Sequence, residues 1–109
     1  MHIILHISIA PEWQQGRVDM VNPLVELALV EHANLPGLYE LPAGDTYALP
    51  LVNGEQIQVW AAYTATQQSV LQLKYQQQVL LQLRQQGAFH LEMVLPDGRH
   101  YQFHWQIVP

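Results

Sequence analysis

The chain has 109 residues, no cysteine and a formal net charge of −5, with nine acidic and four basic side chains. The length predicts a single domain over residues 1–109. The lack of cysteine excludes a disulfide framework and a cysteine-ligated zinc site, and four cations are too few for a surface that binds nucleic-acid phosphates. Only 12% of the residues are charged, against about 25% in ordinary globular proteins, which favours association with a partner or with a second copy.

The N-terminal segment MHIILHISIAPEW has apolar residues at every second position, namely Ile3, Leu5, Ile7 and Ile9. A strand turns alternate side chains to opposite faces, so this pattern predicts a strand with one buried face. The segment has neither the basic start nor the cleavage pattern of a signal peptide, and no run approaches the roughly 18 apolar residues of a membrane helix. We therefore expect a cytoplasmic protein with no membrane partner.

The segment from residue 22 to residue 33 has the signals of a helix. Asn22 suits the N-cap, Pro23 suits the first helical position, and Pro36 with Gly37 marks the end. Its apolar residues cover most of a helical circumference, so we expect the helix to be covered on more than one side, by the sheet or by a second molecule.

Apolar residues occupy odd-numbered positions through the rest of the chain, a pattern called parity here. Successive strands keep this parity on one face of a sheet only if the turns between them have an odd number of residues. Three-residue loops ending in a left-handed glycine do so, and they fit LPDGR, LVNGE and RQQGA. The predicted cross-strand pairs are Met93 with Tyr101, Leu91 with Phe103, Phe89 with Trp105, Leu49 with Ile57, Leu51 with Glu55, Leu83 with Phe89 and Leu81 with Leu91.

Residues 66–86 are rich in Gln and Leu and allow two interpretations. Parity favours two strands, at about 69–75 and 79–85, that turn at Gln76–Gln78. Composition favours one helix from 66 to 86 that ends at Gly87. With two strands, the fold class is α+β and mainly antiparallel β: an N-terminal strand, one helix at about 22–33, and a curved meander of six or seven strands packed on the helix.

The even positions of the last hairpin are polar. The predicted pairing puts His90 opposite His104, Glu92 opposite Gln102 and His100 opposite Val94. If the first strand lies beside this hairpin, His2 and His6 face the same side. Two imidazoles with Glu92 suit a divalent ion such as zinc, and Glu92 with His90 is the best local acid–base pair. The alternative is a solvated face on which His alternates with Gln.

Trp60 breaks the parity and lies with Gln56 and Gln58 on the predicted polar face, while Trp13 lies in a predicted loop. Tryptophan is enriched at binding hot spots, so these four residues are the candidate partner-binding residues. The alternative is that a loop of the same chain covers Trp60.

Three functions remain open. The pattern favours a small non-enzymatic protein that binds another protein or itself, as an inhibitor, immunity factor or assembly component. A second hypothesis is a small-ligand binder with an apolar cavity rimmed by the odd-numbered tyrosines. A third is a metal-dependent or acid–base enzyme that uses His90, His104 and Glu92. The glycines form no phosphate-binding loop, so we expect no cofactor.

Overall fold

A computed structural model describes residues 1–9, 24–42, 45–51, 54–87 and 89–109, and every regular element in these ranges is a β-strand. None of these residues therefore belongs to a helix that could span a membrane. The strands are β1 (His2–Ile9), β2 (Leu24–Ala28), β3 (Val30–Glu31), β4 (Tyr39–Glu40), β5 (Tyr47–Pro50), β6 (Gln56–Tyr63), β7 (Gln68–Tyr75), β8 (Gln78–Gln86), β9 (Phe89–Val94) and β10 (His100–Val108).

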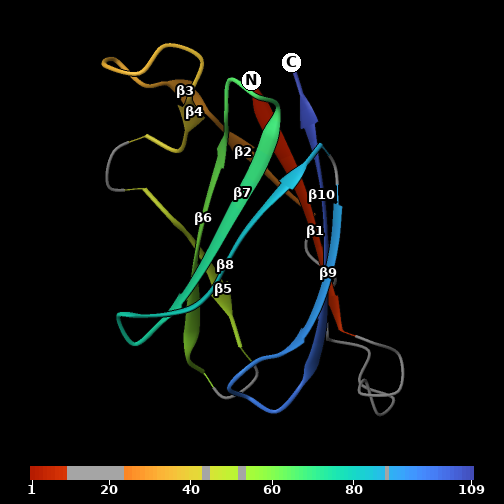
Figure 1. Cartoon of the computed structure of the whole chain (residues 1–109). Helices are drawn as coiled ribbons and strands as arrows, with labels where there is room; N and C mark the ends of the chain where they lie inside the picture. Colours follow the sequence, from red (N-terminus) through yellow and green to blue (C-terminus); the bar gives the residue numbers. More distant parts are fainter. Residues whose placement is uncertain (10–23, 43–44, 52–53, 88) are drawn as a thin grey trace.

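The strands form two antiparallel sheets. One sheet has the order β2-β1-β10-β9, and the other has the order β3-β4-β6-β7-β8, with β5 also paired to β6. Figure 1 shows β1, β9 and β10 on one side of the molecule and β6, β7 and β8 on the other. The core lies between the sheets and is built from odd-numbered side chains of both, including Ile3, Leu5, Ile7, Ile57, Val59, Leu71, Leu73, Phe103 and Trp105. The predicted antiparallel meander is confirmed.

The hairpin of β9 and β10 confirms the predicted turn and pairing. Its cross-strand pairs include Met93 with Tyr101, Leu91 with Phe103, and Phe89 with Trp105. The turn is closed by two backbone hydrogen bonds, in which the Leu95 amide donates to the Arg99 carbonyl at 3.0 Å and the Gly98 amide donates to the Leu95 carbonyl at 2.9 Å. Gly98 has φ 79°, the left-handed conformation that the loop requires.

The turn between β5 and β6 also matches its prediction. Leu49 lies opposite Ile57, and the Leu51 amide donates to the Glu55 carbonyl at 2.8 Å. Residues 52 and 53 lie outside the described residues. The three-residue loop keeps Leu49 and Leu51 on the same face as Ile57, as the hydrophobic pattern demands.

Residues 66–86 form two strands, so the single-helix alternative is wrong. The turn has only two residues, Gln76 and Gln77, with φ values of 50° and 67°. A two-residue turn shifts parity by one, and a β-bulge shifts it back: Lys74 pairs with Val79, whereas the next pair is Leu73 with Leu81. The unpaired Leu80 is the extra residue, and its insertion returns the odd-numbered leucines of β8 to the inner face.

The predicted helix at 22–33 is wrong. Leu24–Ala28 is β2, which pairs with β1, and Val30–Glu31 is β3, which pairs with β4 in the other sheet. Leu29 lies between these strands, is buried, and donates its amide to the Met1 carbonyl at 2.8 Å. The apolar residues of this segment belong to two short strands in two different sheets. Their combined pattern resembled that of a helix with apolar residues on most of its surface. Asn22 and Pro23, the residues taken as helix-starting signals, lie outside the described ranges.

The predicted pairing of Leu83 with Phe89 and Leu81 with Leu91 is also wrong. In the described residues β8 pairs with β7 and β9 pairs with β10, each in its own sheet. Gly87 does adopt a left-handed conformation, with φ 66°. Its amide donates to the carbonyl of Gln67 at 3.2 Å, so the chain is held against the residue that precedes β7 as it leaves for the opposite sheet.

Candidate functional site

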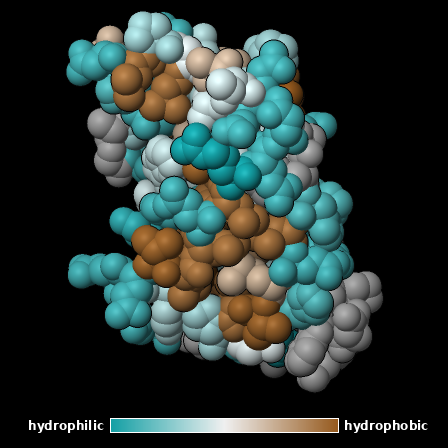
Figure 2. Space-filling model, viewed as in Figure 1, coloured by the Kyte–Doolittle hydropathy of each residue, from teal (hydrophilic) through white to brown (hydrophobic). Residues whose placement is uncertain are grey.

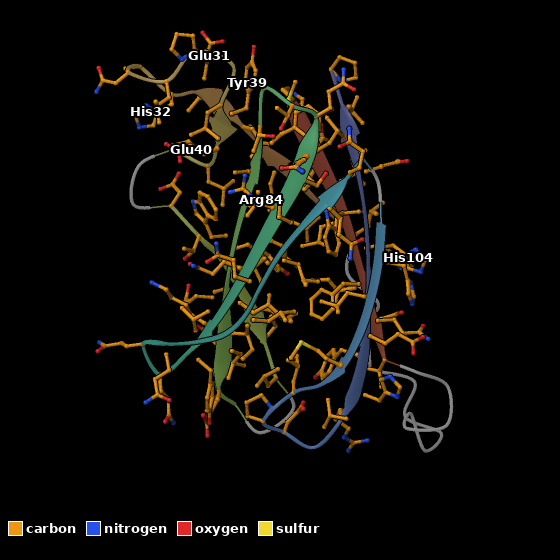
Figure 3. The ribbon with its side chains drawn as sticks, viewed as in Figure 1. Glu31, His32, Tyr39, Glu40, Arg84 and His104 are labelled. Atoms are coloured by element: carbon orange, nitrogen blue, oxygen red, sulfur yellow. The ribbon has the colours of Figure 1, made fainter. Side chains whose placement is uncertain are left out.

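Three histidines form a line across the outer face of the first sheet, here called the histidine row. His6 on β1 lies opposite His104 on β10, and His104 lies opposite His90 on β9. All three side chains are exposed, and Figure 3 shows His104 projecting away from the space between the sheets. The predicted pairing of His90 with His104 is confirmed, and β1 adds His6 beside them.

The imidazoles of His90 and His104 are joined by a short contact. His90 Nδ1 lies 2.5 Å from His104 Nε2, and His90 Nε2 lies 3.2 Å from Glu92 Oε1. A carboxylate accepts hydrogen bonds only, so His90 donates to Glu92 from Nε2. A neutral His90 then has its lone pair on Nδ1 and accepts the hydrogen bond from His104. The three side chains therefore form a directed chain from His104 through His90 to Glu92.

The carboxylate of Glu92 has two further partners. Gln102 Nε2 donates to Oε1 at 2.9 Å, and His100 Nε2 lies 3.4 Å from Oε2. The hydrogen bond from His90 is the largest cause of a lowered Glu92 pKa, followed by the bond from Gln102; burial opposes them, and His100 and His90 lower the pKa further when they are protonated. These contacts favour the ionised carboxylate. The predicted pairs of Glu92 with Gln102 and of His100 with Val94 are both present.

The predicted set of His90, His104 and Glu92 does not converge on one point. Glu92 contacts one nitrogen of His90 and His104 contacts the other. Across the described part of the chain, no three His, Asp or Glu side chains are arranged to hold a metal ion as they stand. A hollow of ≈ 790 Å³ lies beside the histidine row, and it is lined by all three of its imidazoles with Ile4 and Leu24.

Trp60 lies on the outer face of the second sheet, as parity predicted. It is half-buried and lines a groove with Gln58, Leu41 and Pro42. Gln58 accepts a hydrogen bond of 2.6 Å from the Thr46 hydroxyl, so the segment before β5 covers part of this face. Gln56 is exposed. Trp13 lies outside the described residues.

Two of the tyrosines that parity assigns to the inner face donate hydrogen bonds to carboxylates. The Tyr101 hydroxyl donates to Asp97 Oδ2 at 2.6 Å, and the Tyr75 hydroxyl donates to Glu55. Burial first, and then the bond to Asp97, raises the pKa of Tyr101, while the bond to Glu55 raises the pKa of Tyr75. Both tyrosines are therefore structural hydrogen-bond donors.

The sequence analysis missed a pair formed by His32 and Glu40. His32 Nε2 lies 3.6 Å from Glu40 Oε1, and the Asn34 amide donates to His32 Nδ1 at 3.1 Å. Figure 3 shows both side chains at one end of the molecule, near β3 and β4. The helix prediction placed His32 on a different element, and nothing local in the sequence signals its pairing with Glu40.

A further surface lies where the sandwich is open, at β8 and β9. Leu71 and Leu73 on β7 are 0% exposed, whereas Val79 and Leu80 on β8 are 51% and 38% exposed. Other apolar residues of the two edge strands are half-buried, namely Leu81, Leu83, Leu91 and Met93. Figure 2 shows hydrophobic residues gathered at the centre of this side of the molecule.

Comparisons of this chain with protein-family models, with curated proteins and with solved structures found no match. The geometry of these surfaces is therefore the basis for the function proposed below.

Proposed function

We propose that the protein is a non-enzymatic assembly component that pairs with a second copy of itself along β8. The observation that carries the proposal is the free edge of this strand: in the described residues β8 is the last strand of its sheet and pairs with β7 alone. A free edge offers a row of backbone N–H and C=O groups to another strand. Addition of a strand there would also cover the exposed apolar residues.

The composition of β8 favours a second copy as the occupant. The strand reads QVLLQLRQQ, nine residues with one charge, although natural edge strands are commonly protected by charges. An antiparallel pair centred on Gln82 places Leu81 opposite Leu83 of the second copy and Leu80 opposite its Arg84. No like charges meet, and the apolar inner stripe continues from one copy to the other.

The side chains on the outer face of the sheet also favour a dimer centred on Gln82. Trp60, Gln72 and Gln82 lie opposite one another across β6, β7 and β8, and Gln72 Nε2 donates to Gln82 Oε1 at 2.9 Å. Pairing at Gln82 brings two such rows end to end, so that glutamine amides can bond across the join. Trp60 and Gln58 lie on β6, two strands from the join, and belong to the same continuous outer face.

The test is sedimentation equilibrium of the tag-free protein over a range of concentrations, where we expect dimers. Gln82→Glu places two carboxylates opposite each other and should weaken the dimer at least tenfold. Gln106→Glu makes the same change of charge at an exposed residue of β10 in the other sheet, so it is the matched control and should change the dimer little. An equimolar mixture of Gln82→Glu and Gln82→Lys should restore a mixed dimer. A monomer at every concentration, or a dimer that Gln82→Glu does not weaken, would contradict the proposal.

A further inference from the structure

We propose that His90 and His104 chelate a divalent transition-metal ion, of the zinc or nickel type, on the outer face of the first sheet, with His6 as a third imidazole. This site goes beyond the proposed assembly function, because it lies on the opposite sheet from β8. Imidazole nitrogen is a preferred ligand of these ions.

The carboxylate of Glu92 prepares His90 as a ligand. A metal-bound histidine generally donates its other ring N–H to a carboxylate, which fixes the tautomer and makes the ligand nitrogen more basic. Glu92 accepts from His90 Nε2 at 3.2 Å, so the lone pair of neutral His90 lies on Nδ1, on the side of His104. Glu92 is thus a positioning residue for the metal ligand. This accounts for its place on the far side of the His90 ring.

The spacing of the two imidazoles requires a small change only. Zinc–nitrogen bonds of about 2.0–2.1 Å place two nitrogens of a tetrahedral site roughly 3.3 Å apart, and His90 Nδ1 and His104 Nε2 are 2.5 Å apart. The rings therefore open by less than about 1 Å to admit the ion. His104 binds as the neutral tautomer with its proton on Nδ1, so the metal replaces the hydrogen bond between the two rings.

The third ligand comes from the neighbouring strand. His6 is the direct cross-strand neighbour of His104, on the side away from His90, and it lines the same hollow as the other two imidazoles. Paired strands hold such neighbours with Cβ atoms about 5 Å apart, and all three side chains are exposed and able to change rotamer. Ile4 and Leu24 line the hollow beside them.

The test is calorimetric titration of the tag-free protein with zinc chloride and, separately, with nickel chloride at pH 7.5. We expect one ion per chain. His104→Gln should weaken binding at least tenfold, and His6→Gln should weaken it by less. Glu92→Gln should weaken it by about 10- to 100-fold, as expected for loss of a carboxylate that orients a ligand. Imidazole nitrogen NMR should show the metal-induced shifts at His90 Nδ1 and His104 Nε2.

The matched control is His2→Gln. His2 lies on the same face of β1 and contacts a carboxylate, with Nδ1 3.1 Å from Glu26 Oε1, but its neighbours across the sheet are Val108 and Ala28. This variant should bind the metal as the wild type does. Failure of the wild type to bind either ion, or equal weakening by His2→Gln and His104→Gln, would overturn the site. Neither result bears on dimer formation through β8, which sedimentation measures separately.

Discussion

The hydroxyl of Ser69 donates a hydrogen bond of 2.7 Å to the carbonyl oxygen of Gly87. Ser69 lies near the start of β7 and is 0% exposed, and Gly87 follows the last residue of β8. The bond therefore ties the inner strand of one sheet to the point where the chain leaves for the other. In the described residues β8 and β9 belong to different sheets, and the proposed pairing of two copies uses the edge of β8 that this arrangement leaves unpaired.

Ser69→Ala should lower the free energy of unfolding by about 1–3 kcal/mol, because the variant leaves the Gly87 carbonyl without its buried donor. Urea unfolding measures the change. Ser8→Ala is the matched control: the Ser8 hydroxyl is only partly buried and lies 3.4 Å from Gln102 Oε1, so its loss should cost less than about 0.5 kcal/mol. Equal losses in the two variants would show that the crossing does not depend on Ser69.

The turn between β7 and β8 stores backbone strain. Gln76 and Gln77 both have positive φ, a conformation that costs a residue with a side chain on the order of 1 kcal/mol. Such turns favour Asn-Gly. The double change Gln76→Asn and Gln77→Gly should therefore raise the free energy of unfolding by about 1 kcal/mol, measured by urea unfolding.

The control for this turn is Gln85→Gly in the extended part of β8. There glycine brings no relief and adds entropy to the unfolded chain, so stability should fall by about 0.5–1 kcal/mol. A turn variant that is no more stable than the wild type would contradict the left-handed conformation of Gln76 and Gln77.

Glu92 should titrate below the ordinary carboxyl range, because the hydrogen bond from His90 lowers its pKa. The carboxyl carbon signal in NMR reports this directly. His90→Leu should move the Glu92 pKa upward, since it removes the hydrogen-bond donor that is the largest cause of the shift. An unchanged Glu92 titration in His90→Leu would show that His90 does not hold the carboxylate.

The lowered pKa of Glu92 also makes the free energy of unfolding depend on pH. Well above the unfolded value of about 4.3, Glu92 is ionised in both states and its contribution to stability is complete. That contribution declines as pH falls below the unfolded value and is lost once pH has passed through the lower pKa of the folded protein. Glu92→Gln should remove this part of the acid dependence of unfolding.

Much of the histidine row follows from sequence, because both of its determinants are local. The two-residue period of a strand assigns His90 and His104 to one face, and the LPDGR loop sets their pairing. His6 was placed on the same face by parity, on condition that β1 is a neighbour. The alternation of apolar residues cannot predict that β1 pairs with β10, because these two strands are far apart in the sequence.

The two errors of the fold prediction have a common physical origin. At Leu29 and again at Gly87 the chain leaves one sheet for the other. A pattern of buried positions records that a side chain faces the core, and both sheets face the same core. Odd-numbered residues therefore remain the buried ones when the chain moves from one sheet to the other, and the pattern does not mark the move. The choice of sheet depends on contacts between residues far apart in the chain.

Leu29 and Leu24 test whether the chain crosses from one sheet to the other at Leu29. The two-strand arrangement buries only one of these side chains, whereas both belong to the apolar surface of the rejected helix. Leu29 is 4% exposed and Leu24 is 70% exposed. Leu29→Ala should therefore lower the free energy of unfolding by about 2–5 kcal/mol, the usual cost of a cavity in a core. Leu24→Ala should change it by less than about 0.5 kcal/mol, as at other exposed sites. Similar losses in the two variants, measured by urea unfolding, would mean that Leu24 is covered and that the chain does not cross between sheets at Leu29.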